Sequence, residues 1–173
     1  MMKKMMTLLL LATTIFFTGC DWIKDLGEVD FSTDLVVTIP VTVQNDKKAS
    51  LNFSASGELK LADNEDIEPY LKKLRKIDLN SVLVTVTGLT SGQTINTLSL
   101  DAIDVGTLFT QNNITSSNNS FTPQVNANIL QQAGEKLKND RKLVLTVSGT
   151  VSGPMVFNVG LVFESNITAG ALD

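Results

Sequence analysis

The chain has 173 residues and a formal net charge of −4, with 14 basic and 18 acidic side chains, no histidine and one cysteine. The acidic balance argues against nucleic acid as a partner, because affinity for a phosphate backbone comes from Lys and Arg. The lack of histidine removes the usual general base and the commonest transition-metal ligand, and a single cysteine cannot form a disulfide within the chain.

The first 19 residues contain the three parts of an export signal in order. A basic pair precedes an apolar run over 5–17, and the small residues Thr18 and Gly19 follow that run. The apolar run of about 13 residues is shorter than the roughly 20 residues that a membrane-spanning helix needs. Residues 1–19 are therefore predicted to be a cleaved signal peptide and not a permanent membrane helix.

Cys20 follows the small residues directly, and the tetrapeptide Phe17-Thr18-Gly19-Cys20 resembles the lipobox of bacterial lipoproteins. The resemblance implies that a diacylglycerol is attached to the cysteine thiol and that the chain is cut just before Cys20. The family usually has Leu at the position that Phe17 occupies here. The alternative is a free or buried cysteine behind an ordinary signal peptide. Because a lone cysteine has no disulfide partner within the chain, we favour lipidation.

Residues 20–33 are expected to form the lipidated cysteine and its tether. Loss of two lysines with the signal peptide changes the net charge from −4 to −6, so membrane association would rest on the acyl chains, palmitate among them. Acidic residues after Cys20 resemble the surface-export signals of some Bacteroidetes-type lipoproteins, whereas Asp21 would indicate inner-membrane retention in enterobacteria. A plain solvated linker is the third reading. We expect a lipid anchor in the bacterial cell envelope, at the outer membrane, with the periplasmic or surface face left open.

Residues 34–173 are expected to form a single β-rich domain. Strict alternation of apolar and polar residues predicts strands over 35–44 and 51–61, joined as an antiparallel hairpin. Pro40 cannot donate to a sheet ladder, so the first strand is expected at a sheet edge or a bulge. The spacing then becomes helical over 67–74, which predicts a short helix capped by residues 63–66. A calcium loop at 63–66 is the alternative, but the segment lacks the spacing and the glycine of such loops.

The next strand is predicted to begin at Val82 after a bulge at Asn80-Ser81, to turn at 88–92 and to return over 95–100. Residues 101–122 predict a weak strand followed by a mobile polar loop. A second helix is then predicted, with Thr122 as its N-cap, Pro123 at its first position and an apolar stripe through Leu137. Gly134 should weaken that helix by roughly 1 kcal/mol relative to alanine. Strands over 143–151 and 155–163 are expected to form a closing hairpin.

About seven strands and two short helices predict a mainly β fold, an immunoglobulin-like β-sandwich. The alternative is an α+β fold with two helices on one mixed sheet. The similarity of 82–92 to 143–153 would support it if it reflects a duplication rather than recurrent strand composition. The strand around Pro40 and the closing hairpin are also similar, over short stretches, to the sandwich of late-embryogenesis-abundant proteins of the LEA14 type. That likeness implies no functional residues.

The sequence contains no nucleophile elbow, P-loop or dinucleotide fingerprint. We therefore expect no enzymatic activity, no cofactor and no metal site, with a hydrolase acting through two carboxylates as the alternative. The predicted function is that of a lipid-anchored, non-enzymatic binding module for an envelope partner. Alternatives are a structural or assembly subunit that pairs through a strand edge and a carrier of an apolar ligand. Glycan binding is not favoured, because few aromatic side chains are present to stack on sugars.

Overall fold

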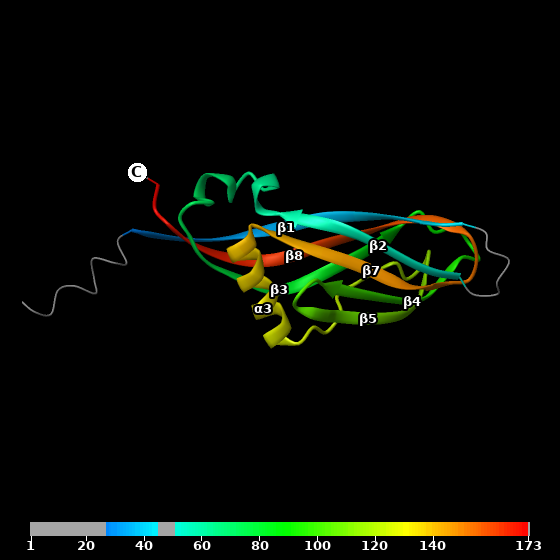
Figure 1. The fold of residues 1–173 in the computed structure, drawn as a ribbon. Helices are drawn as coiled ribbons and strands as arrows, with labels where there is room; N and C mark the ends of the chain where they lie inside the picture. The colour runs from blue at the N-terminus through cyan, green and yellow to red at the C-terminus, as the bar shows by residue number, and fades with distance from the viewer. Residues whose placement is uncertain (1–26, 45–50, 173) are drawn as a thin grey trace, which may run out of the picture.

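The computed structural model describes residues 27–44 and 51–172, which form a sandwich of two four-stranded antiparallel sheets (Figure 1). One sheet has the order β1 (Glu28–Val43), β8 (Met155–Gly170), β3 (Leu74–Thr87) and β6 (Ser120–Phe121). The other has the order β2 (Leu51–Lys60), β7 (Lys142–Val151), β4 (Thr94–Ala102) and β5 (Gly106–Thr115). The prediction of a mainly β sandwich is confirmed, and the alternative of one mixed sheet is wrong.

The strands pair in a nested order, the first with the last and each following strand with the preceding one from the end. β1 pairs with β8, β2 with β7, β3 with β6 and β4 with β5, as if one long hairpin had been rolled up. This is the topology of an eight-stranded jelly roll. In an immunoglobulin domain the first two strands share a sheet, whereas β1 and β2 lie in opposite sheets here.

The predicted hairpins are wrong although their strands exist. β1 and β2, β3 and β4, and β7 and β8 are consecutive strands, and in each case the two members lie in opposite sheets. An alternating pattern specifies which face of a strand is buried, but it does not specify which strand lies beside it. Two local predictions are confirmed. Pro40 lies on the edge strand β1, and the pairing of β3 with β8 has a register shift between Leu79 and Ser81.

The core lies between the two sheets and consists of the inward residues of the strands. Ile39 of β1, Leu145 of β7 and Phe163 of β8 are fully buried. Phe53 of β2 meets Phe157 of β8 edge to face, with ring centroids 5.3 Å apart, so that aromatic contact joins the two sheets. Burial of this apolar area is the main contribution to the stability of the sandwich.

The first predicted helix is wrong. The 61–73 connection contains only two 3₁₀ turns, η1 (Leu61–Asp63) and η2 (Glu68–Tyr70), and β3 begins at Leu74. The last residue of the predicted helix belongs to the sheet instead. Leu74 lies opposite Ala169, and the Gly170 amide donates to the carbonyl of Lys73. The tether predicted over 20–33 is shorter than expected for the same reason, since residues 28–33 pair with β8.

The second predicted helix exists but begins later. Helix α3 (Ala127–Asp140) is capped by Asn126, whose side chain accepts from the Asn128 amide, and not by Thr122. The weak strand predicted within 101–122 exists as β5, and the polar loop that was expected after it is shorter, because β5 extends to Thr115. Leu108, Phe109 and Ile114 of this strand are buried. No helix in the part of the chain that the structure describes is long and apolar enough to cross a membrane.

Candidate functional site

The residues of the predicted lipidation site, Phe17, Thr18, Gly19 and Cys20, lie outside the described ranges 27–44 and 51–172. The structure therefore neither tests nor alters the prediction made for them. What it does describe is the domain into which the chain leads from Gly27 onward.

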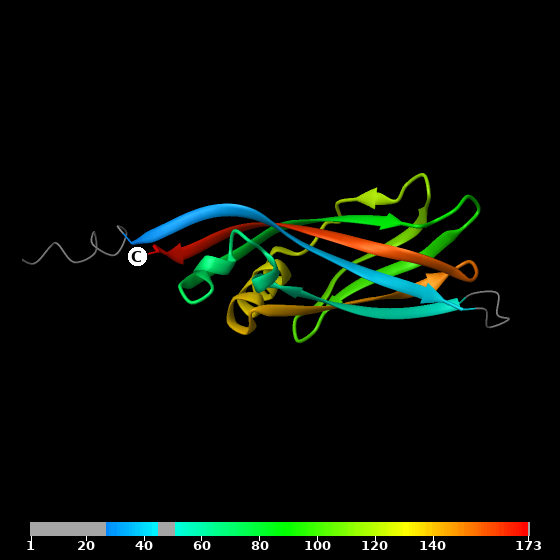
Figure 2. The same ribbon diagram turned by 90° about the horizontal axis from the view of Figure 1, so that it is seen from above.

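The two ends of the sandwich differ in their connections, as Figure 2 shows. At one end, here called the base, Glu28 of β1 lies opposite Gly170 of β8, so the described chain begins and ends there. The 61–73 connection, the turn between β4 and β5, and α3 belong to the same end. The opposite end, called the tip, carries the loops 88–93, 116–119 and 152–154. β1 has 16 residues, which at about 3.3 Å per residue spans roughly 50 Å.

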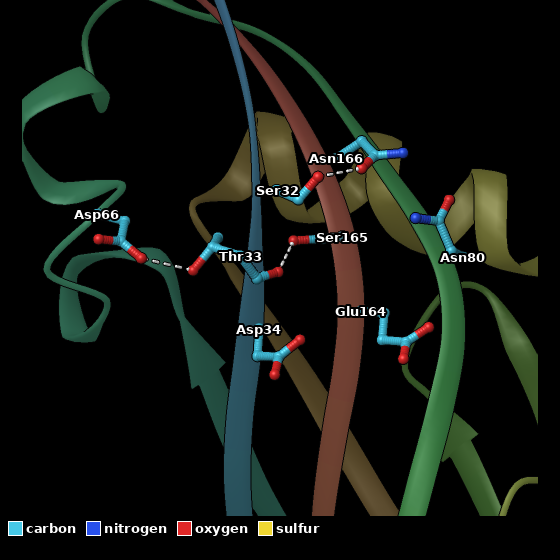
Figure 3. A pocket seen from close by; sticks show the side chains of 8 residues that line it. All are labelled: Ser32, Thr33, Asp34, Asp66, Asn80, Glu164, Ser165 and Asn166. Carbon is cyan, nitrogen blue, oxygen red and sulfur yellow. Dashed lines mark hydrogen bonds between the residues drawn. The ribbon is translucent and has the colours of Figure 1, made fainter.

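A polar hollow of about 490 Å³ opens on the base half of the sheet, beside the 61–73 connection (Figure 3). We call it the basal hollow. It is lined by residues of β1, β8 and β3 and by one residue of the connection: Ser32, Thr33, Asp34, Asp66, Asn80, Glu164, Ser165 and Asn166. The lining is polar, unlike the apolar cavity that a carrier of an apolar ligand needs.

Hydrogen bonds between the lining residues tie the connection to the sheet. Thr33 Oγ1 donates to Asp66 Oδ2 at 2.8 Å, and Ser165 Oγ donates to the Thr33 carbonyl at 2.6 Å. Ser165 is only 2% exposed, so this bond satisfies a buried hydroxyl. On the outer face, Ser32 Oγ donates to Asn166 Oδ1 at 2.8 Å, again between β1 and β8. These side chains therefore have a structural role in joining β1 to β8 and to the 61–73 connection.

Asn64 is the central residue of this arrangement, although it lies just outside the hollow that contains Asp66. Its Nδ2 donates to the Asp34 carbonyl at 3.0 Å, and its Oδ1 accepts from the amides of Asp66 and Ile67 at 3.0 and 3.2 Å. One side chain therefore closes the turn and fastens it to the free edge of β1. Covering an edge in this way protects it from pairing with other chains.

The role of Asn64 could be predicted only in part. The sequence placed a cap within 63–66, and an Asn side chain does accept from amides there. Asn is a residue that commonly forms such side-chain turns. The bond from Asn64 to the Asp34 carbonyl crosses between segments far apart in the chain, so no local pattern indicated it. Ser165 was missed for the same reason, because its partner lies on β1.

We expect Asn64→Ala to lower the free energy of unfolding by roughly 1–3 kcal/mol, because it leaves the Asp34 carbonyl and the Asp66 amide without the partner that the Asn64 side chain provides. Urea unfolding of the mature chain, followed by circular dichroism, measures the change. Glu65→Ala is the matched control, since Glu65 is exposed in the same turn. Equal unfolding midpoints for the two variants would contradict the role given to Asn64.

The carboxylates of the basal hollow are partly engaged. Asp34 and Glu164 lie opposite each other in the pairing of β1 with β8, and Ser81 Oγ donates to Glu164 Oε2 at 2.7 Å. Asp66 accepts from Thr33. Within the described ranges, no group of three or more acidic or cysteine side chains has a geometry that could hold a metal ion. The hollow offers polar contacts and a net negative charge, which suit a hydrogen-bonding partner.

Ion pairs elsewhere at the base link neighbouring elements. The hydrogen bond from Lys142, helped by that from Lys60, holds the pKa of the Glu58 carboxyl below its usual value. Hydrogen bonds to Asp104 and Asp140 raise the pKa of the Lys136 ammonium, which lies 2.9 Å from each carboxylate. The ion pair of Lys136 with Asp104 joins α3 to the turn between β4 and β5. All of these groups are at the protein surface, so salt will screen them.

The charged residues of the described chain are confined to the base half. On one sheet the charged residues nearest the tip are Asp34 of β1 and Glu164 of β8. On the other sheet they are Glu58 of β2 and Asp101 of β4. Beyond these positions, the strands and tip loops within residues 27–44 and 51–172 contain no Asp, Glu, Lys or Arg. The charge-free segments are 35–44, 51–57, 79–100, 105–121 and 143–163.

No family model matches this chain, and no curated protein matches it. Among solved structures, it is similar to one titled Desmodium yellow mottle tymovirus, with 13% identity and a TM-score of 0.36 over 84% of this chain and 91% of that chain. It is also similar to an empty head of Turnip yellow mosaic virus, with 10% identity and a TM-score of 0.38 over 84% of each chain. Similarity at this level carries no functional argument.

Proposed function

We propose that the mature protein is a lipid-anchored, non-enzymatic interaction module of the bacterial cell envelope, attached to the outer membrane through Cys20. The observation that carries the proposal is the order of the first 20 residues: a basic pair, a short apolar run, two small residues and then the only cysteine. A run of this length is typical of a cleaved signal and not of a membrane helix. Lipidation gives the lone cysteine a role that no disulfide could give it.

The arrangement of the domain supports the proposal. β1 begins at Glu28, so only a short segment separates Cys20 from folded structure. The chain enters at the base, and the tip lies roughly 50 Å from that point along β1. An anchor on Cys20 would therefore hold the charged base nearest the membrane and present the tip loops and the charge-free faces to partners in the surrounding space.

The proposal of a non-enzymatic role is supported by the chemistry of the side chains. The sequence contains no histidine to serve as a general base. Two acidic residues of the basal hollow, Asp66 and Glu164, accept hydrogen bonds from Thr33 and Ser81, and these bonds join strands and the connection to one another. These carboxylates have a structural task that accounts for their position.

The anchor is tested by radiolabelled palmitate incorporation in cells that express the protein. We expect the wild-type chain to take up label and to fractionate with membranes, and Cys20→Ala to lose all label and to be released from membranes. Thr14→Ala, within the apolar run, is the matched control and should keep the label. Continued labelling of Cys20→Ala would overturn the proposal.

A further inference from the structure

The end of the sandwich at which the chain enters carries a run of basic residues. They lie where the 61–73 connection passes into β3, and we call them the basic segment: Lys72, Lys73, Arg75 and Lys76. The Gly170 amide donates to the Lys73 carbonyl at 2.8 Å, and the Ala171 amide donates to the Gly27 carbonyl at 2.6 Å. The basic segment therefore lies beside the residues at which the described chain begins and ends (Figure 1).

The charges at this end differ in sign from those of the rest of the domain. The residues level with the start of β1 are 27–31, 71–77 and 167–172, and among them only Glu28 and Asp30 are acidic. The rest of the described chain has five basic and twelve acidic residues. An acidic domain therefore has a locally basic end, and that end is the one next to the segment that carries Cys20.

The side chains of the basic segment are accessible to another anion. Lys72, Arg75 and Lys76 are exposed. Arg75 pairs with Glu28, and Lys76 pairs with Asp78 at 2.7 Å. Exposed ion pairs of this kind contribute little to stability, because water and salt screen them. Arg75 and Lys76 can therefore exchange their carboxylates for phosphate groups at small cost.

We propose that the basic segment binds the phosphate groups of anionic phospholipids and so holds the base of the sandwich against the membrane. The inference rests on the proposed function, because it takes Cys20 as the point of attachment. The chain from Cys20 to Gly27 reaches at most about 24 Å when fully extended. The anchor therefore keeps the basic segment close to the lipid headgroups, whereas the tip lies roughly 50 Å farther away along β1.

The contact sets the orientation of the domain and does not replace the acyl chains. Lys and Arg are attracted to an anionic bilayer mainly within one Debye length, roughly 8 Å at physiological salt. Asp21 and Asp25, which precede the domain, and the acidic charge of the mature chain oppose this attraction. An anchored domain should therefore turn its basic segment, and not one of its acidic surfaces, toward the bilayer.

The test couples the mature chain through the Cys20 thiol to a maleimide phospholipid in nanodiscs. One set of discs contains phosphatidylcholine alone, and the other contains about one third phosphatidylglycerol, which is anionic. A gadolinium-chelate lipid in both sets broadens the NMR signals of amides near the bilayer. We expect the broadening at the Leu74 and Gly170 amides to be at least about threefold larger on the anionic discs and to lose this gain in about 0.5 M salt. The Gly153 amide at the tip should be unaffected on both.

The double variant Lys72→Gln, Lys76→Gln should abolish the gain on anionic discs. Lys60→Gln, Lys142→Gln is the matched control, because it removes two exposed lysines from the other sheet, and it should keep the gain. Circular dichroism confirms that each variant is folded. Equal broadening of the parent chain on both kinds of disc would overturn the proposal, as would a gain that the first variant keeps or the control loses. Chemical coupling replaces the natural lipid, so this result is independent of palmitate labelling in cells.

Discussion

The mature chain carrying Gly149→Ala is expected to unfold at a markedly lower urea concentration than the parent chain. Gly149 lies on β7 opposite Leu98 of β4, close to the register shift of the two strands between Ile95 and Thr97. A Cβ at this position would overlap the carbonyl oxygen of Thr97 and would lie 2.7 Å from its carbonyl carbon and 3.1 Å from Cζ of Phe53. The obstructing atoms belong mainly to the backbone of a central strand, so no side-chain rotation relieves the overlap.

Relief therefore requires β4 and β7 to separate, which disturbs the middle of their sheet. Inserting one methyl group into a packed interior typically costs about 1–3 kcal/mol, and more where backbone must move. We expect a loss of at least about 3 kcal/mol, a large part of the roughly 5–15 kcal/mol that stabilises a typical domain. Urea unfolding followed by circular dichroism measures it.

Gly153→Ala is the control for this prediction, because it makes the same chemical change in the loop between β7 and β8. Nothing lies within 4 Å of a Cβ built at Gly153. Its unfolding midpoint should stay close to that of the parent chain. Matching midpoints for Gly149→Ala and Gly153→Ala would show that the close approach of β4 to β7 is not a constraint on the fold.

Gly134→Ala is expected to destabilise the protein even though alanine is the better helix former. Helix propensity alone predicts a gain of roughly 1 kcal/mol. In the fold, however, a Cβ at this position would overlap the carbonyl oxygen of Ile77 and lie 3.3 Å from its carbonyl carbon. Glycine allows α3 to approach β3 closely, and we expect its replacement to cost about 1–3 kcal/mol net.

Thermal unfolding measures the sign of this effect directly. Gln132→Ala is the matched control, because Gln132 is exposed on the same helix and its replacement changes propensity without a steric conflict. Its melting temperature should change little. A melting temperature for Gly134→Ala above that of the parent chain would mean that propensity outweighs packing and that α3 lies farther from β3 than the structure indicates.

The sequence pattern predicted the strands of this fold better than it predicted their pairing. Alternation located most strands and their buried faces, as at Leu35 and Ile39, because a period of two depends only on the strand itself. The partner of each strand was not predictable in this way. Val41 lies opposite Phe157, and no local signal connects positions so far apart in the chain.

The errors in the helices have a related cause. Ile67 is buried, as its place in the predicted helical stripe required, but Leu74 is taken by sheet pairing with β8. Tertiary pairing outweighs a local helical pattern in that segment. The basal hollow was likewise beyond prediction, because it brings together Thr33, Asp66 and Ser165 from three separate segments. Of this arrangement, the local sequence predicted only that a residue within 63–66 would cap a turn.

The pairing of the first strand with the last has a consequence for how the chain folds. Glu28 lies opposite Gly170, and β8 is also the neighbour of β3, so β1 has no partner in its sheet, and β3 has only the two-residue strand β6, until β8 is present. Contacts between such distant positions require large loops to close, which slows folding to milliseconds or longer. A growing chain therefore cannot complete this sheet early, and β1 stays unpaired in the sheet until β8 has been synthesised.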